Sequence, residues 1–140
     1  SPETLRFGAM RPFCVTDDKA EAMQFLENAR WQIRLSQSLR RKEQEMDGGL
    51  LIEKTWEGEP SLEEMGSFML VGDADTVAAR MAAEIRAASP CHYLLQMQIG
   101  DLPPAIAMNT IKAWESAIRP RLEREFGPLD RIGVPVPAAA

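Results

Sequence analysis

The order of sequence patterns along this chain predicts an α/β protein with a parallel sheet. Short apolar segments with strand character alternate with segments of helical periodicity, in the order strand, helix, long loop, strand, helix, strand, helix. Strands that alternate with helices form βα units, whose strands run parallel. The strand segments are nearly continuously apolar, which is typical of a sheet covered on both faces. The 140 residues are enough for one domain.

The first βα unit is the most clearly marked. Leu5 to Val15 is rich in strand formers, and its glycine and proline indicate a bend or a bulge. Asp18 with Glu21 three residues later resembles a capping box, and the helical pattern continues to about Arg40. We expect the buried stripe of this helix to contain Ala22, Phe25, Ala29 and Ile33, broadened by Met23, Leu26 and Trp31.

Two further units follow the long loop. Phe68 to Val71 predicts a strand, and Asp73 then caps a helix. Cys91 to Ile99 predicts the third strand, and Pro120 breaks or kinks the helix after it. The inward positions of these two helices are Val77, Met81 and Ile85 in the first, and Ala107, Ile111, Trp114 and Ile118 in the second.

Residues 41–66 and 127–140 interrupt this regular order. The segment 41–66 carries glycine turn signals, many charges and no sustained periodicity, so we expect a mobile, lid-like insertion. Trp56 and the apolar cluster around Leu51 argue against complete disorder there. The end of the chain, 127–140, forms a tail, whose last stretch, GVPVPAAA, is expected to be poorly ordered.

Composition excludes several classes of function. A net charge of -5 and a pI near 5.0 argue against a nucleic-acid partner, because phosphate binding needs a basic surface. No segment approaches the roughly 18 consecutive apolar residues of a membrane helix. Cys14 and Cys91 are expected to be buried thiols in a reducing compartment, and no secretory signal is visible. The sequence therefore predicts a cytoplasmic protein.

The familiar catalytic motifs are absent. The sequence contains no GxGxxG, GxxxxGK, GxSxG or HExxH, and with one histidine and no CxxC a metal site is not expected. His92 lies at the start of its strand, whereas reactive groups in parallel α/β folds follow the carboxyl ends. Gly72 precedes a helix start, but the carboxylate of Asp73 would cap that helix and repel a phosphate.

The stretch CHYLLQMQIGDLPP carries the best candidate site. Period two places Gln96 and Gln98 on one face of the strand, with Tyr93, Leu95, Met97 and Ile99 on the other. Buried amides need hydrogen-bond partners, so the glutamines either face a ligand in a barrel lumen or are hydrogen-bonded within a polar barrel interior and touch no ligand. Gly100 and Asp101 form the turn at the carboxyl end.

Three stretches of the sequence resemble the luciferase-like flavin-dependent monooxygenases. FMLVGDADTVAARM and HYLLQMQIGDLPPAIAMNTIKAWESAIRPRL resemble the C-terminal region of that family, and FCVTDDKAEAMQFLENARWQIRLSQSLR resembles its sixth strand and the following helix. Together they span roughly residues 11–122.

The resemblance implies the C-terminal three βα units of a TIM (β/α)8 barrel of the bacterial luciferase type. It implies a partial domain over residues 1–140, with reduced FMN or a deazaflavin as the cofactor and a small organic molecule as the substrate. Gln98, Gly100 and Asp101 would then line the flavin side of the rim, and Leu51 and Trp56 would belong to the lid. The family's catalytic residues match no position here, so we assign no catalytic residue and give His92 and Cys14 no such role.

These expectations leave two main functions open. The first is the C-terminal part of an oxygenating flavoenzyme that needs the missing N-terminal portion of the barrel or a complementary chain. The second is a non-catalytic barrel piece that stabilises or pairs with an active partner chain. Either one allows a homodimer or a heterodimer, and a small binding domain unrelated to flavin is a third possibility.

Overall fold

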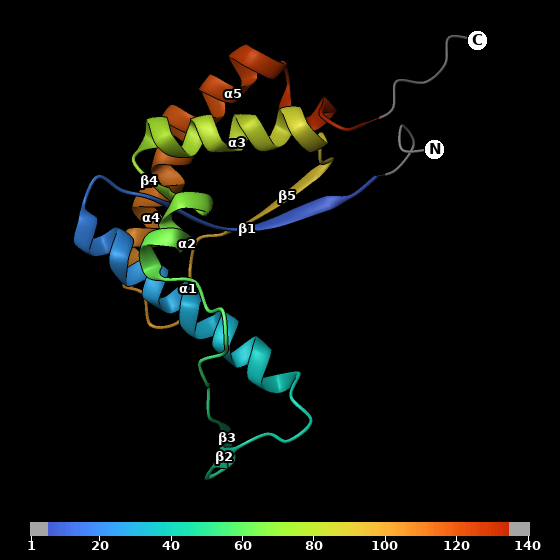
Figure 1. The fold of residues 1–140 in the computed structure, drawn as a ribbon. Helices are drawn as coiled ribbons and strands as arrows, with labels where there is room; N and C mark the ends of the chain where they lie inside the picture. The colour runs from blue at the N-terminus through green and yellow to red at the C-terminus, as the bar shows by residue number, and fades with distance from the viewer. Residues whose placement is uncertain (1–5, 135–140) are drawn as a thin grey trace.

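The computed structural model describes residues 6–134, which form a three-stranded parallel sheet with helices on both faces (Figure 1). The sheet contains β1 (Gly8–Val15), β4 (Leu70–Gly72) and β5 (His92–Gln96), and a separate hairpin contains β2 (Met46–Asp47) and β3 (Leu50–Leu51). The helices are α1 (Lys19–Leu39), α2 (Leu62–Phe68), α3 (Ala74–Ala88), α4 (Pro104–Ala113) and α5 (Arg119–Phe126), with the π turn η2 (Trp114–Ile118) and the 3-10 turn η3 (Leu129–Arg131). The predicted α/β class with parallel strands is confirmed.

Strand β1 lies at the centre of the sheet and changes partner along its length. Residues 8–12 pair with β5, and residues 13–15 pair with β4. Pro12, which has no N–H to donate, is the last residue of the β5 pairing. The prediction that this strand reaches back to Leu5 concerns a residue outside the described range.

The strand order β4-β1-β5 differs from the barrel expectation, in which consecutive strands lie side by side in chain order. Strand β5 lies beside β1, and the outer edge of β4 is closed by a side chain. The guanidinium of Arg80 in α3 donates to the carbonyl oxygens of Met69 and Val71, at 2.6 and 3.3 Å. An edge whose acceptors are already bonded offers little to a further strand.

Alternating residues of the sheet build two cores. Phe13 and Val15 of β1 pack with α3, η2 and α5 on one face, and Cys14 packs with α1 and α2 on the other. Both Asp18 and Asp73 cap their helices as predicted, and Val77, Met81 and Ile85 of α3 are all buried. The local signals of α1 and α3 were therefore sufficient to place both helices.

The helical segment 104–126 wraps around the edge of β1 and joins the two cores. Strand β5 ends opposite Pro12, and beyond that point the buried Thr110 of α4 takes its place. The Thr110 hydroxyl accepts a hydrogen bond from the N–H of Val15 at 3.1 Å. Ile106 of α4 packs on the α1 side, and Ile118 of η2 packs on the α3 side.

The α-helix is interrupted before Pro120, as expected, and the interruption is the π turn η2 between α4 and α5. A proline ring clashes with the carbonyl four residues earlier in a regular α-helix. In η2 the N–H of Arg119 bonds to the carbonyl of Trp114, and the wider turn accommodates the ring. The indole of Trp114 meets the ring of Phe13 edge-on, with centroids 5.9 Å apart.

The predicted lid region is shorter than 41–66. Ser61 and Glu64 form a complete capping box, so α2 begins at Leu62 and fully buries Met65 in the core. The S-x-x-E pattern was present in the sequence, and it also moves the second strand from Phe68 to Leu70. Before it, the carboxylate of Glu59 ties the returning chain to α1 through Arg34, with oxygen and nitrogen 2.6 Å apart.

Three expectations about helix faces were wrong. Met23, Trp31 and Ile111 are exposed, because α1 extends past the sheet and α4 presents only one side to the core. The predicted tail also packs, since Leu129 and Ile132 contact the α3 core. The remaining tail residues, 135–140, lie outside the described range.

Between residues 6 and 134 there is no helix with the length and apolarity needed to cross a membrane.

Removing the Thr110 hydroxyl is expected to destabilise the fold. A Thr110→Val variant keeps the shape but leaves the Val15 N–H buried without a partner, which costs about 1–3 kcal/mol in the free energy of unfolding. Thr110→Ser keeps the hydroxyl and loses one methyl, about 0.8 kcal/mol. Urea unfolding measures both, and a valine variant more stable than the serine variant would contradict this role.

Candidate functional site

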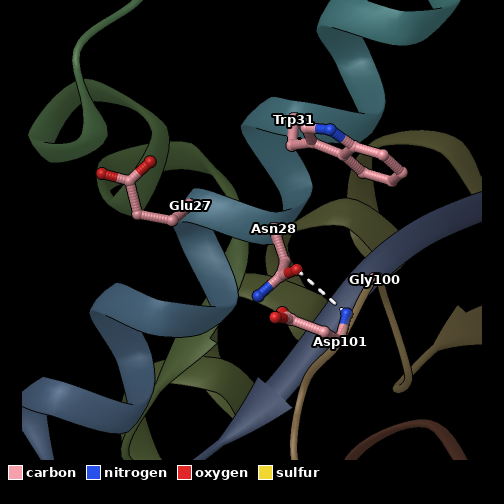
Figure 2. A pocket seen from close by; sticks show the side chains of 5 residues that line it. All are labelled: Glu27, Asn28, Trp31, Gly100 and Asp101. Carbon is pink, nitrogen blue, oxygen red and sulfur yellow. Dashed lines mark hydrogen bonds between the residues drawn. The ribbon is translucent and has the colours of Figure 1, made fainter.

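A hollow of about 480 Å3 lies where the chain leaves the carboxyl end of β5. Glu27, Asn28 and Trp31 of α1 form one wall, and Gly100 and Asp101 form the other (Figure 2). Helix α1 follows β1, so the walls come from the segments after β1 and β5, which lie side by side in the sheet. Open α/β sheets commonly bind ligands outside the carboxyl ends where the strand order reverses, and here it reverses at β1.

Asn28 holds the two walls together. Its side-chain oxygen accepts the backbone N–H of Asp101 at 3.3 Å, as drawn in Figure 2, and its amide nitrogen donates to the carbonyl of Gln24 at 3.0 Å. Ile99 and Leu102 flank the loop and are buried in the α1 core. The rim is therefore anchored at three points, although its outer residues are exposed.

Gly100 is required in this position for two physical reasons. Its φ of +59° lies in the left-handed region, which costs other residues about 1–2 kcal/mol. A Cβ atom there would also lie 2.0 Å from the side-chain oxygen of Asn28. The predicted rim residue Gly100 thus lets the loop approach α1 closely.

The two glutamines bond within the protein, and neither lines the hollow. Gln98 donates to the carbonyl of Leu102 at 2.6 Å and closes its own loop, and Gln96 donates to Gln32 of α1 at 3.1 Å. The strand ends at Gln96, so Ile99 turns into the α1 core, away from the α3 core that Met97 packs against. The expected single apolar face therefore stops before Ile99.

The hollow offers an aromatic surface and carboxylates. The indole of Trp31 is 44% exposed, and the side chain of Asp101 is free of hydrogen bonds to residues 6–134. Glu27 points away from the rim in Figure 2 and pairs with Arg30 at 2.6 Å. Since no basic side chain lines this hollow, it suits a flat ring with N–H donors rather than a phosphate.

A second hollow, at the carboxyl ends of β1 and β4, is lined by one basic residue, Lys19, and by three aspartates, Asp17, Asp18 and Asp73. It lies between the starts of α1 and α3. Asp18 already accepts the N–H of Ala20 at 2.7 Å, and Asp73 accepts that of Thr76 at 2.8 Å. The Thr76 backbone and hydroxyl donors lower the pKa of Asp73, so the start of α3 carries a negative charge. The capping role predicted for Asp73 is confirmed.

Leu51 and Trp56, expected in the lid, lie away from the rim. The insertion contacts the second half of α1, where the backbone N–H of Lys54 donates to Ser38 at 3.1 Å. Ser38 is ten residues beyond Asn28, about 15 Å along the helix. Neither Leu51 nor Trp56 lines the hollow.

The remaining reactive groups are dispersed. Cys14 is buried, Cys91 is half-buried, and both thiols are free, so the expectation of two buried thiols holds for Cys14 alone. His92 is exposed at the amino end of β5, the pole opposite the rim. Across residues 6–134, no cluster of three histidine, cysteine or acidic side chains could hold a metal ion.

The α1 wall of this site was missed in the sequence. Trp31 was assigned to the buried stripe, and Asn28 and Glu27 were not singled out. Asn28 and Trp31 are three residues apart, so they share a helix face. An asparagine beside a tryptophan on one helix face is only a weak indication of a binding site. These residues become part of a hollow only because the β5 loop, which is distant in the sequence, packs against them.

Comparison with known proteins finds a relative of part of this chain. An uncharacterized protein of Sinorhizobium fredii, y4vJ, is 31% identical over 113 residues, which are 80% of this chain and 32% of that protein. The matched segment thus spans about a third of the relative's length. No family model matches the chain, and no solved structure matches it significantly.

Substitution of Gly100 is expected to show strong coupling to Asn28. Gly100→Ala combines the left-handed backbone cost of about 1–2 kcal/mol with the clash against Asn28. In the double variant with Asn28→Ala the clash is gone, so Gly100→Ala should cost less there than in the wild-type background. Chemical denaturation of the four proteins measures this, and strictly additive effects would contradict the close approach.

Stability is expected to fall at high pH because of Cys14. Burial raises the pKa of its thiol from 9.0 to about 11, partly offset by the Thr110 hydroxyl and reinforced by the charge of Glu21. The unfolded chain then ionises first, so the free energy of unfolding falls as the pH rises from about 9 towards 11. Cys14→Ser should reduce this fall in the free energy of unfolding, and Cys91→Ser should leave the fall unchanged. An equal dependence of the free energy of unfolding on pH in the wild type and both variants would contradict the role of Cys14.

Proposed function

We propose that this chain is the C-terminal part of a longer luciferase-like flavin-dependent monooxygenase. In such an enzyme, reduced flavin, FMN or a deazaflavin, reacts with O2 to oxygenate a small organic substrate. The parallel βα units and the three resembling stretches support this proposal, and so does the relative's length, of which the matched segment is 32%. The two free thiols favour a reducing compartment such as the cytoplasm.

The observation that carries the proposal is the composition of the β5 rim. Trp31 offers a ring surface, and Asp101 offers an acceptor for a ring N–H. The loop between them is held in place before any ligand arrives, so little ordering is needed on binding. The residues here therefore fit the ring end of a flavin.

The same rim does not fit the phosphate end of a flavin. It contains no basic side chain, and the neighbouring helix starts are closed by Asp18 and Asp73. The phosphate would have to be held by residues from the rest of a longer protein. A flavin whose ring and phosphate are held by different parts of a longer protein is consistent with a chain that contributes one side of the site.

The barrel itself remains part of the proposal, and it requires one rearrangement. In a barrel, β5 would pair with the outer edge of β4, where Arg80 now binds the carbonyl groups. The place of β5 beside residues 8–12 of β1 would go to the strand that precedes β1 in the longer protein. The insertion 41–61 would then cover a different region from the one expected of a lid.

A non-catalytic role is the second candidate, favoured by the absence of a nucleophile or histidine from the residues that line the rim. In that role the chain would complete the sheet of an active partner without contacting its flavin.

Complementation separates the two functions. The chain is mixed with the two thirds of the Sinorhizobium relative that lie outside the match, and flavin fluorescence is followed during a titration with FMN. For the enzyme we expect a flavin site in the mixture and none in the chain alone. A complex that forms without binding FMN would support the non-catalytic role, and the absence of both would contradict the barrel proposal.

A matched pair of tryptophan variants tests the rim within that mixture. Trp31→Ala removes the stacking surface, worth up to about 1.5 kcal/mol, and should weaken FMN binding roughly tenfold. Trp56→Ala, on the insertion, should leave binding unchanged. Equal effects of the two variants would exclude the rim as the ring site.

A further inference from the structure

An apolar cavity of about 130 Å3 lies at the amino end of β5, at the pole opposite the rim. Residues 90–93 form its strand side, and side chains of the α3 core form the rest. These side chains belong to Met81, Ile85, Trp114, Leu122, Leu129 and Ile132. An engineered apolar cavity of about 150 Å3 stays free of water and binds benzene. The present cavity is therefore close to the size that admits a small hydrocarbon.

The polar side chains on the strand side are already hydrogen-bonded or exposed. The Tyr93 hydroxyl donates to Glu84 at 3.2 Å, and the Cys91 thiol donates to the carbonyl of Phe7 at 3.2 Å. His92 is exposed at the surface. Within residues 6–134, no buried side-chain nitrogen or oxygen beside this cavity lacks a hydrogen-bond partner. A polar guest would therefore leave its own donors or acceptors unpaired, which is costly in an apolar site.

The segment that contains η3 covers the outer side of the cavity. Leu129 and Ile132 line the cavity from this segment and are half-buried, so they lie between it and the solvent. Gly133 follows with a φ of +64°, and a Cβ atom there would lie 2.1 Å from the carbonyl oxygen of Ser89. The cover is thus packed closely against the turn that precedes β5.

We propose that this cavity is a binding site for a small uncharged hydrocarbon of about the size of benzene. Its volume sets the size of the guest, and its paired polar groups exclude guests that carry donors, acceptors or charge. The rings of Tyr93 and Trp114 in its lining favour an aromatic guest.

This site is separate from the rim and goes beyond the proposed flavin function. Helix α3 connects β4 to β5, and such a helix packs beside its strands in an open sheet and in a closed barrel alike. The cavity therefore does not compete with a longer protein for the outer edge of β5.

Urea unfolding of the full chain at a series of benzene concentrations tests the site. A guest that binds only the folded chain raises the free energy of unfolding as its concentration exceeds the dissociation constant. We expect a saturable effect with a dissociation constant of about 1 mM or below. Phenol has nearly the same size but carries a hydroxyl, so it should bind at least tenfold more weakly.

A matched pair of phenylalanine variants locates the bound guest. Ile85 is 3% exposed and lines the cavity, so the added atoms of Ile85→Phe have the cavity to occupy. This variant should lose the benzene effect. Leu50→Phe, on the exposed hairpin, should keep it. Unfolding without benzene establishes that both variants fold, and the comparison of benzene with phenol needs no variant.

Four results would overturn the proposal. The first is a wild-type stability that does not depend on benzene, and the second is equal binding of benzene and phenol. The third is an equal benzene effect in Ile85→Phe and Leu50→Phe. The fourth is a chain ending at Val134 that binds benzene at least tenfold more tightly than the full chain, since residues 135–140 would then be the natural occupant. None of these measurements uses flavin.

Discussion

The hydrogen bond from the Val15 N–H to the Thr110 hydroxyl marks the constraint on which the rest of the structure depends. Strand β1 loses its β5 partner after Pro12, and its last residues would otherwise have an unpaired edge inside the protein. Burying an unpaired amide is costly, so α4 must reach this edge. Its position in turn directs the whole segment 104–126 around the sheet and joins the two cores.

The candidate site is a consequence of that helix placement. The loop from Gln96 to Pro104 must connect the end of β5 to α4, and Ile99 and Leu102 fill the α1 core on the way. Gly100 and Asp101 are the residues left outside, held against Asn28. A rim made in this way is rigid because its neighbours are buried, and its chemistry is set by few groups. These few groups are the exposed indole of Trp31 and the carboxylates of Glu27 and Asp101.

The sequence predicted what local interactions determine and missed what distant contacts determine. Helices α1 and α3 were placed correctly because Asp18, Asp73 and the apolar spacing act within one or two turns. The turn at Gly100 and Asp101 was predicted because a glycine-acid pair after a strand is a local signal. The strand order was missed because it depends on Arg80 closing β4 and on Thr110 replacing β5, contacts between residues far apart in the chain. The exposure of Trp31 was missed for the same reason, since the residues facing it come from the β5 loop.

Arg80 closes the β4 edge of the sheet. A single guanidinium, in place of a neighbouring strand, occupies the carbonyl oxygens of Met69 and Val71 on the outer side of β4, whereas the outer side of β5 has no strand partner within residues 6–134. One cation held against two carbonyl oxygens therefore does for β4 what a neighbouring strand would otherwise do, because it satisfies acceptors that an edge strand leaves unpaired.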